Sequence, residues 1–263
     1  MLFDRDHNLF MLISTLVIVI TLVCFKLFVK DQKRKDMFLK VSAILTVIIH
    51  FSSLYVDYFS NGEAYVESVM LLPIYPCNVI MWLLVIVAFF KDKNSKIFNI
   101  LAEITFYIGI TGGVIGIALN ENYSNTPDLR DWDILKGLIS HATMLLGCIY
   151  LLVGNYIKIR VSNLKSIIIG LCGLLIDGYL MIAIYKHFQM DPPNTMFLLE
   201  SPLPQVKWVN TWFIGILAII VGFIITATYE QIALDKEDRW YNKIRLNKIN
   251  NNEKELEDKK EQY

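Results

Sequence analysis

Long apolar blocks constrain this chain more than any other feature of its sequence. Stretches of about twenty mostly apolar residues follow one another along the 263 residues, and about twenty are needed for an α-helix to cross the hydrocarbon core of a bilayer. The chain is 55% hydrophobic, with a mean hydropathy of +0.46. Because backbone polar groups find no water inside a bilayer, the crossing segments must be helices or a closed barrel. The sequence therefore predicts an all-α, polytopic membrane protein.

The apolar blocks predict seven transmembrane helices, in one domain over residues 1–230. The expected spans are 9–29, 38–59, 68–90, 97–119, 135–156, 164–186 and 207–229. The first block is too long for a signal-peptide core and lacks a small-residue cleavage site, so we expect it to be retained. Residues 231–263 are charged and polar, which predicts a tail that is a short helix or disordered.

Basic residues are sorted between alternate connections, which predicts the orientation. Twenty of the 25 lysines and arginines fall in segments 26–40, 91–96, 155–165 and 231–263. Basic residues remain on the cytoplasmic side, so we expect the N-terminus outside and the C-terminus in the cytoplasm. Abundant isoleucine, lysine and asparagine favour a bacterial plasma membrane. The net charge of zero gives no indication of a nucleic-acid partner.

A cysteine lies next to a predicted helix break inside the third span. Pro73 and Pro76 interrupt the helical hydrogen bonds just before Cys77 and Asn78. Such a break is tolerated at membrane depth only where the backbone faces protein or a water-filled cavity. The four cysteines have no zinc-ligand or Cys-x-x-Cys spacing, so we expect neither a metal site nor a disulfide framework.

Four ionisable side chains fall at a similar depth in different spans. On the predicted orientation, His50, Cys77, His141 and Asp177 lie roughly 9–14 Å below the outer interface, at about 1.5 Å per helical residue. Ionisable groups in spans usually face a cavity or one another, so these four are candidates for one site. The alternatives are that His50 only hydrogen-bonds a neighbouring backbone and that Asp177 pairs with Lys186.

A thiol and an imidazole at one depth indicate nucleophilic chemistry. His141 is predicted to take the proton from Cys77 as the thiol attacks an acyl carbonyl, giving an acyl-thioester. Asn78 and backbone N–H groups freed by the helix break are candidate donors to the oxyanion. Asp177 or Asn194 is a candidate to orient the imidazole. This chemistry requires no cofactor and no metal ion.

Small residues and one acidic residue in the fourth span have structural explanations. Gly109 and Gly113, and likewise Gly112 and Gly116, are four residues apart, a spacing that allows close approach between membrane helices. Glu103 lies in the inner half of the same span, away from the polar layer. We expect it to hydrogen-bond between helices.

Three sequence blocks resemble a known group of membrane proteins. The chain is similar to the YwaF-type bacterial integral membrane proteins and to their eukaryotic relatives, the transmembrane protein 164 family. The matching blocks are Leu72-Pro73-Ile74-Tyr75-Pro76-Cys77-Asn78; Gly112-Gly113 with Thr126-Pro127-Asp128 and Ser140-His141; and Asn194-Thr195-Met196-Phe197-Leu198 with Ser201-Pro202. Tyr75 stands where the family often has histidine, so we expect it to support the site or bind the substrate, and a further histidine upstream of His141 is missing.

The resemblance implies a seven-span fold related to that of the androgen-induced membrane hydrolases. It also implies acyl transfer onto phospholipids through a cysteine and a histidine, which map onto Cys77 and His141. The leading hypothesis is a lipid acyltransferase or acyl hydrolase acting on a phospholipid or lysolipid. The alternative is a transporter, permease or receptor for a small solute bound in the outer half of the membrane. The odd number of spans and the lack of a visible inverted repeat disfavour a transporter.

Overall fold

The computed structural model describes residues 2–62, 72–202 and 206–244, and these ranges contain helices and turns but no strand. The α-helices are α1 (Arg5–Phe28), α2 (Gln32–His50), α3 (Ser52–Asn61), α5 (Pro76–Phe89), α6 (Lys96–Ala118), α7 (Glu121–Asn125), α8 (Trp132–Val153), α9 (Lys165–His187) and α10 (Thr211–Ala233), and the 3-10 turns are η1 (Val161–Asn163), η2 (Thr195–Phe197) and η3 (Lys236–Asp238). Five helical segments, those containing α1, α6, α8, α9 and α10, are long and apolar enough to cross a membrane. The chain is an all-α polytopic membrane protein.

Each of the seven predicted spans contains a helix, but two differ from the prediction. The helix expected over 38–59 ends at His50, and the chain turns at Phe51 before α3 begins. The span expected over 68–90 contains the 14-residue helix α5, which starts only at Pro76, and residues 63–71 lie outside the described ranges. The count of seven spans therefore remains a prediction. The same holds for the tail, of which residues 245–263 are not described.

Several of the helices begin where the sequence supplies a capping side chain, whereas α3, α5 and α9 begin without one. Asp31 accepts a hydrogen bond from the Arg34 N–H at the start of α2, and Asn210 accepts one from the Phe213 N–H at the start of α10. Ser95 caps α6 in the same way. These bonds satisfy N–H groups that the first helical turn leaves without a partner.

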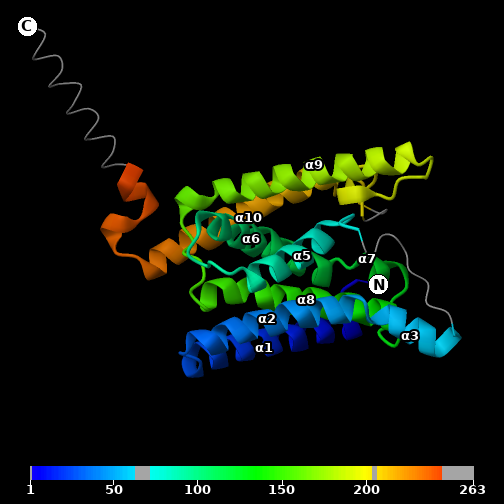
Figure 1. Ribbon diagram of the computed structural model, residues 1–263, viewed down its shortest axis with the longest axis horizontal. Helices are drawn as coiled ribbons and strands as arrows, with labels where there is room; N and C mark the ends of the chain where they lie inside the picture. The colour runs from blue at the N-terminus through cyan, green and yellow to red at the C-terminus, as the bar shows by residue number, and fades with distance from the viewer. Residues whose placement is uncertain (1, 63–71, 203–205, 245–263) are drawn as a thin grey trace, which may run out of the picture.

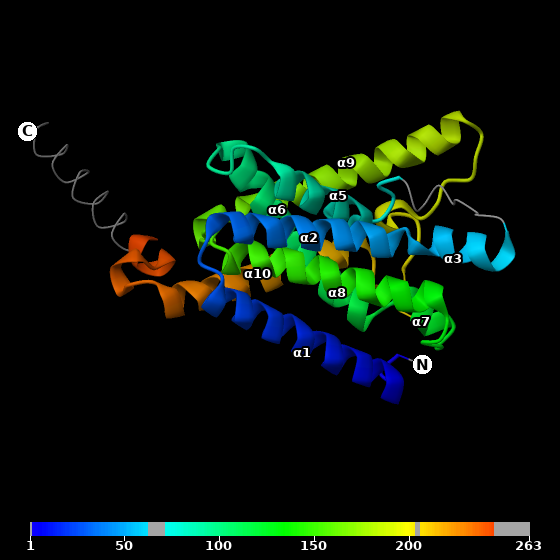
Figure 2. The same cartoon turned by 60° about the horizontal axis from the view of Figure 1, so that its bottom comes forward.

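Helix α6 lies at the centre of the bundle, between α9 and α10 on one side and α8, α2 and α1 on the other (Figures 1 and 2). A β-carbon added at Gly109, Gly113 or Gly116 would lie 3.0 Å or less from a side-chain atom of α8, whereas one at Gly112 would meet nothing within 4 Å. Three of the four glycines thus allow the predicted close approach, and Gly112 does not take part. Glu103 of α6 accepts a hydrogen bond at 2.5 Å from the Ser166 hydroxyl of α9, which confirms its predicted use between helices.

The described parts of the four basic segments lie at one end of the bundle (Figure 1). The Lys93 ammonium is 3.6 Å from the Asp36 carboxylate, and the Lys26 ammonium is 3.5 Å from the Asn155 side-chain oxygen. The buried Glu230 carboxylate accepts backbone N–H bonds both from the connection before α9 and from the start of the tail. The N-terminus lies at the opposite end (Figure 1). The bundle therefore has one strongly basic end.

This arrangement sharpens the prediction of orientation. We expect the basic end to face the cytoplasm, so a reporter fused after Asn122 should be active outside and one fused after Asn251 should be active inside. Alkaline phosphatase and green fluorescent protein fusions at both positions measure this. An outside signal at Asn251 would show that the predicted orientation is inverted.

Candidate functional site

The predicted interruption of the third span is present just before Cys77. Pro76 occupies the first position of α5, where its missing N–H costs no helical bond, and the residues from Leu72 to Tyr75 are not helical. The carbonyl of the fully buried Ile74 accepts a hydrogen bond from the Met196 N–H at 2.8 Å. A backbone group freed by the break is therefore satisfied by protein, as a position at membrane depth requires.

Cys77 lies in the first turn of α5 and is half-buried. Its thiol donates to the side-chain oxygen of Asn78 at 3.3 Å, and the Asn78 amide donates to the Leu72 carbonyl at 3.2 Å. Asn78 thus links the nucleophile candidate to the extended segment before it. Cys77 also packs against a buried apolar cluster that four helices and η2 supply: Ile80, Ile104, Ile108, Met144, Cys148, Leu174 and Met196.

His141 on α8 is held by its own helix. Its Nδ1 lies 2.7 Å from the Gly137 carbonyl oxygen, and because a carbonyl only accepts, Nδ1 carries the proton. In the neutral ring Nε2 is then the acceptor. A β-carbon at Gly116 of α6 would lie 2.3 Å from Nε2, so the ring rests directly on that glycine. Nε2 has no hydrogen-bond partner among the described residues, and its lone pair is available to take a proton.

His141 is related to the cluster around Cys77 only through its own helix, α8. Met144 follows His141 by three residues, on the same face of α8, and it belongs to the cluster against which Cys77 packs. Within the described ranges no hydrogen bond joins His141 to Cys77, and the thiol is donated to Asn78. Their acting as a catalytic pair remains a prediction.

Asn194 organises its own loop. Its side-chain oxygen accepts from the Leu199 and Glu200 N–H groups at 3.1 and 3.0 Å, and its amide donates to the Glu200 carbonyl at 2.9 Å. The neighbouring Thr195 hydroxyl donates to the Gly178 carbonyl of α9 at 3.0 Å. The geometry gives Asn194 a role in holding this loop on α9, and the group that orients His141 is the Gly137 carbonyl, which sequence reasoning missed.

Two other residues that we predicted to support the site, Tyr75 and His50, lie in different surroundings. The Tyr75 ring stacks on Phe197 with centroids 5.5 Å apart, so it joins the segment before Cys77 to the loop around Met196. His50 lies at the end of α2, where its ring meets Phe51 edge-on at 5.0 Å. Tyr75 therefore belongs to the assembly around Cys77, whereas the ring contact of His50 is with its own neighbour Phe51.

Asp177 lies in the middle of α9 and directly precedes Gly178, against which Met196 and Leu198 pack. Its Oδ2 atom is buried and has no hydrogen-bond partner in the ranges that the structure describes. A buried carboxylate oxygen without a partner is costly and points to an interaction with a substrate, a proton or a solute. The described residues contain no group of three or more His, Cys, Asp or Glu side chains that could hold a metal ion.

A buried histidine near the start of the chain was not recognised from the sequence. His7 is fully buried, its Nε2 lies 2.8 Å from the Ile117 carbonyl of α6, and its ring stacks on Tyr123 at 4.7 Å. Asp4 accepts from the His7 N–H and the Tyr123 hydroxyl, and these bonds lower the pKa of Asp4 to about 2. The cluster fixes the end of α6 that carries Gly116. The available signal was the helix-capping pattern of Asp4 three residues before His7.

The contact between Gly116 and His141 predicts a specific intolerance. A β-carbon introduced by Gly116→Ala would lie 2.0 Å from the His141 ring, so the ring or the helix must move, at a cost of about 1–3 kcal/mol. Gly112→Ala, on the same helix, meets open space and should be nearly neutral. Unfolding of both variants in mixed detergent micelles, followed by circular dichroism, measures the difference. Equal stabilities would contradict this packing.

Comparison with known proteins gives one finding. Residues 2–229 match the family model described as the TMEM164 family. No curated protein and no solved structure matches the chain. The matched range covers all five membrane-length helices apart from the last turn of α10, and it includes both Cys77 and His141.

Proposed function

Because the chain belongs to the TMEM164 family, we propose that it is a membrane-embedded lipid acyltransferase or acyl hydrolase that works through Cys77. Membership in the family indicates lipid-related activity, and the mechanism is our proposal. The observations that support it are a thiol at a broken membrane helix and, on α8, a histidine whose Nε2 has no hydrogen-bond partner among the described residues. Cys77 packs against an apolar cluster, which suits a fatty acyl chain, and His141 lies three residues before Met144 of that cluster.

The proposed reaction has two steps. In the first, the Cys77 sulfur attacks the ester carbonyl of a phospholipid while His141 Nε2 takes the thiol proton. The carbon–sulfur bond forms, the carbon–oxygen bond of the ester breaks, and the lysolipid alcohol leaves with the proton from His141. In the second, a water molecule or a lysolipid hydroxyl attacks the thioester, loses its proton to His141 and releases the Cys77 thiol. Water gives hydrolysis, and a lysolipid gives acyl transfer.

The start of α5 offers a donor for the oxyanion. The Cys77 N–H is in the first helical turn, where N–H groups have no partner among the helical carbonyls. A carbonyl attacked by the Cys77 sulfur would develop its negative charge close to this N–H group. A preorganised donor in such a place is commonly worth a factor of about 10²–10³ in rate. Asn78 is the second candidate, once its contact with the thiol is released.

A cavity next to this assembly is a candidate for the polar headgroup. It has a volume of about 250 Å³, and its lining includes Phe197, Leu198, Glu200, Lys207, Asn210 and Trp212. Phe197 stacks on Tyr75, and Leu198 packs on the cluster around Cys77. Lysine and an interfacial tryptophan are suited to a phosphate-bearing headgroup at the membrane surface. The proposal therefore has the headgroup in this cavity and the acyl ester toward Cys77.

The proposal is tested by trapping the thioester. Membranes containing the full chain are incubated with phospholipid or acyl donors that carry an alkyne on the fatty chain, and protein-bound label is measured before and after neutral hydroxylamine, which cleaves thioesters. Hydroxylamine-sensitive label is the expected result. Absence of label with every donor would favour the alternative, a transporter for a small solute, for which the unpartnered Oδ2 of Asp177 is the supporting observation.

A further inference from the structure

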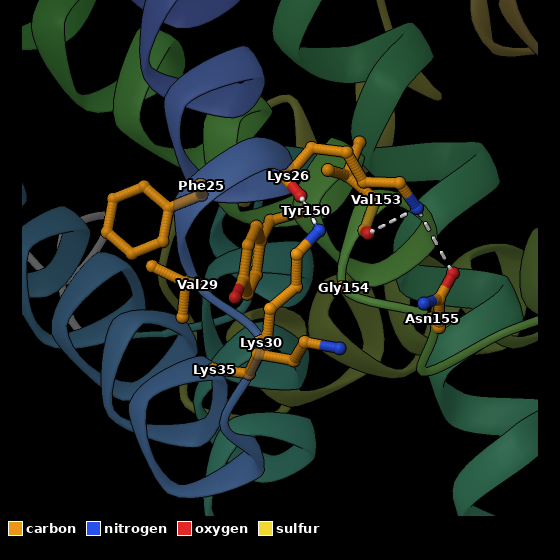
Figure 3. A pocket seen from close by; sticks show the side chains of 9 residues that line it. All are labelled: Phe25, Lys26, Val29, Lys30, Lys35, Tyr150, Val153, Gly154 and Asn155. Atoms are coloured by element: carbon orange, nitrogen blue, oxygen red, sulfur yellow. Dashed lines mark hydrogen bonds between the residues drawn. The ribbon is translucent and has the colours of Figure 1, made fainter.

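A second polar pocket lies at the basic end of the bundle, far along the helices from Cys77. It is formed where α1 ends, where the chain enters α2 and where α8 ends, and its volume is about 80 Å³. Three lysines, Lys26, Lys30 and Lys35, line it together with Tyr150 and Asn155 (Figure 3). A pocket needs about 10–15 Å³ to hold one water molecule, so this one has room for several waters or for one oxyanion.

The pocket carries positive charge that the surrounding residues do not balance. None of its lining residues is acidic. The two carboxylates of the adjoining segment are engaged elsewhere: Asp31 caps α2, and Asp36 accepts from the Tyr156 hydroxyl at 2.6 Å and faces Lys93. Three ammonium groups around one small pocket repel one another unless an anion is present.

The donors that line the pocket are only partly used. The Lys30 ammonium donates to the Lys26 carbonyl at 3.1 Å, and the Lys26 ammonium donates over longer distances to Val153 and Asn155. Each ammonium has three donors. Lys35 makes neither a hydrogen bond nor an ion pair through its side chain in the described part of the chain. Contacts with carbonyls at the helix C-termini therefore use some of the donors of Lys26 and Lys30, but they use none of the donors of Lys35.

Tyr150 gives independent evidence of a ligand. It is only 1% exposed, and its hydroxyl, which points into the pocket beside Val29 and the Lys30 side chain (Figure 3), has no hydrogen-bond partner among the described residues. The hydroxyl oxygen is not one of the fully enclosed polar atoms, so it opens onto the pocket, where a ligand can reach it. The Tyr150 hydroxyl therefore has a proton to donate inside a pocket that three lysines line. An anionic oxygen is the acceptor that the positive charge of these lysines would attract.

From these observations we infer that the pocket binds a phosphate-bearing anion, held by Lys26, Lys30, Lys35 and the Tyr150 hydroxyl. On the predicted orientation it faces the cytoplasm, where basic pockets between membrane helices bind the headgroups of anionic lipids. A soluble phosphate has the same chemistry. The site lies at the opposite end of the bundle from Cys77 and does not depend on the proposed acyl transfer.

The test compares the two sources of phosphate on the purified full chain. Thermal unfolding is followed in detergent micelles doped with phosphatidylglycerol, in micelles doped with diacylglycerol, which has the same chains without phosphate, and in plain micelles with added inorganic phosphate. A ligand that binds the folded state raises the unfolding temperature with its concentration. Stabilisation by phosphatidylglycerol alone identifies a lipid headgroup, and stabilisation by inorganic phosphate identifies a soluble ligand. No stabilisation, or equal stabilisation by diacylglycerol, would overturn the inference.

Variants assign the effect to the pocket. Lys35→Gln should weaken binding about fivefold, as expected for one lysine near a headgroup, and Tyr150→Phe about tenfold, as expected for a hydrogen bond to a charged group. Lys35→Glu should abolish binding. Lys33→Glu is the matched control, because it makes the same charge change on the same segment but lies exposed outside the pocket. If Lys33→Glu weakens binding as much as Lys35→Glu, the effect is general surface charge and the site does not exist.

Discussion

Replacing Cys77 by alanine should abolish hydroxylamine-sensitive acyl labelling completely, the largest effect expected of any single substitution in this chain. The sulfur is the only group in the proposed reaction that forms a covalent bond to the acyl chain, so nothing remains to carry the label. Cys77→Ser should be little better, because a hydroxyl is a far weaker acid than a thiol and one histidine activates it poorly. Labelling is measured by gel fluorescence after coupling a dye to the alkyne.

The other cysteines provide controls for this experiment. Cys172→Ala changes an exposed thiol on α9 and should leave the label intact, which separates acylation at Cys77 from adventitious modification of surface cysteines. Cys148 is unsuitable because it is buried against Gly109, where its loss would alter the packing of α6 on α8. Label that persists in Cys77→Ala, at the same rate as in the unaltered chain, would end the covalent mechanism.

The sequence was sufficient for features that depend on local chemistry. Pro73 and Pro76 predicted the break before Cys77, because proline removes helical hydrogen bonds wherever it occurs. The buried Glu103 was correctly expected between helices, because a carboxylate in a span must find donors. Membership in the transmembrane protein 164 family, expected from three short blocks, is confirmed over residues 2–229.

Features that depend on contacts between residues far apart in the chain could not be predicted from the sequence. The docking of the Met196 loop on the segment before Cys77 uses a backbone N–H and a backbone carbonyl, which every sequence supplies. The spacing of glycines predicted two equivalent pairs in α6, yet only the rotation of α6 against α8 decides that Gly116 faces His141 while Gly112 faces open space. The third group that orients His141 was sought among distant side chains, and it is a carbonyl one turn away on the same helix.

His141→Ala should slow the formation of the thioester by a factor of roughly 10²–10⁴, the usual contribution of a positioned general base, without preventing it. The nucleophile is still present in this variant, so label should accumulate slowly to the same final extent. The Gly137 carbonyl holds the proton on Nδ1 of His141. Nε2 is therefore the atom that takes the thiol proton in the proposed reaction, and the variant lacks it. His187→Ala, which removes an exposed histidine at the end of α9, should label at the normal rate.

Added imidazole distinguishes the loss of a base from the loss of structure. Removing the ring leaves a space beside Gly116, where the residue packs most closely, and a free imidazole that enters it can take the thiol proton. Labelling of His141→Ala should therefore rise with imidazole concentration, whereas the unaltered chain should not respond. Slow labelling that imidazole fails to raise, in a variant that unfolds at a lower temperature than the unaltered chain, would mean that His141 supports the packing of α8 on α6 and has no part in proton transfer.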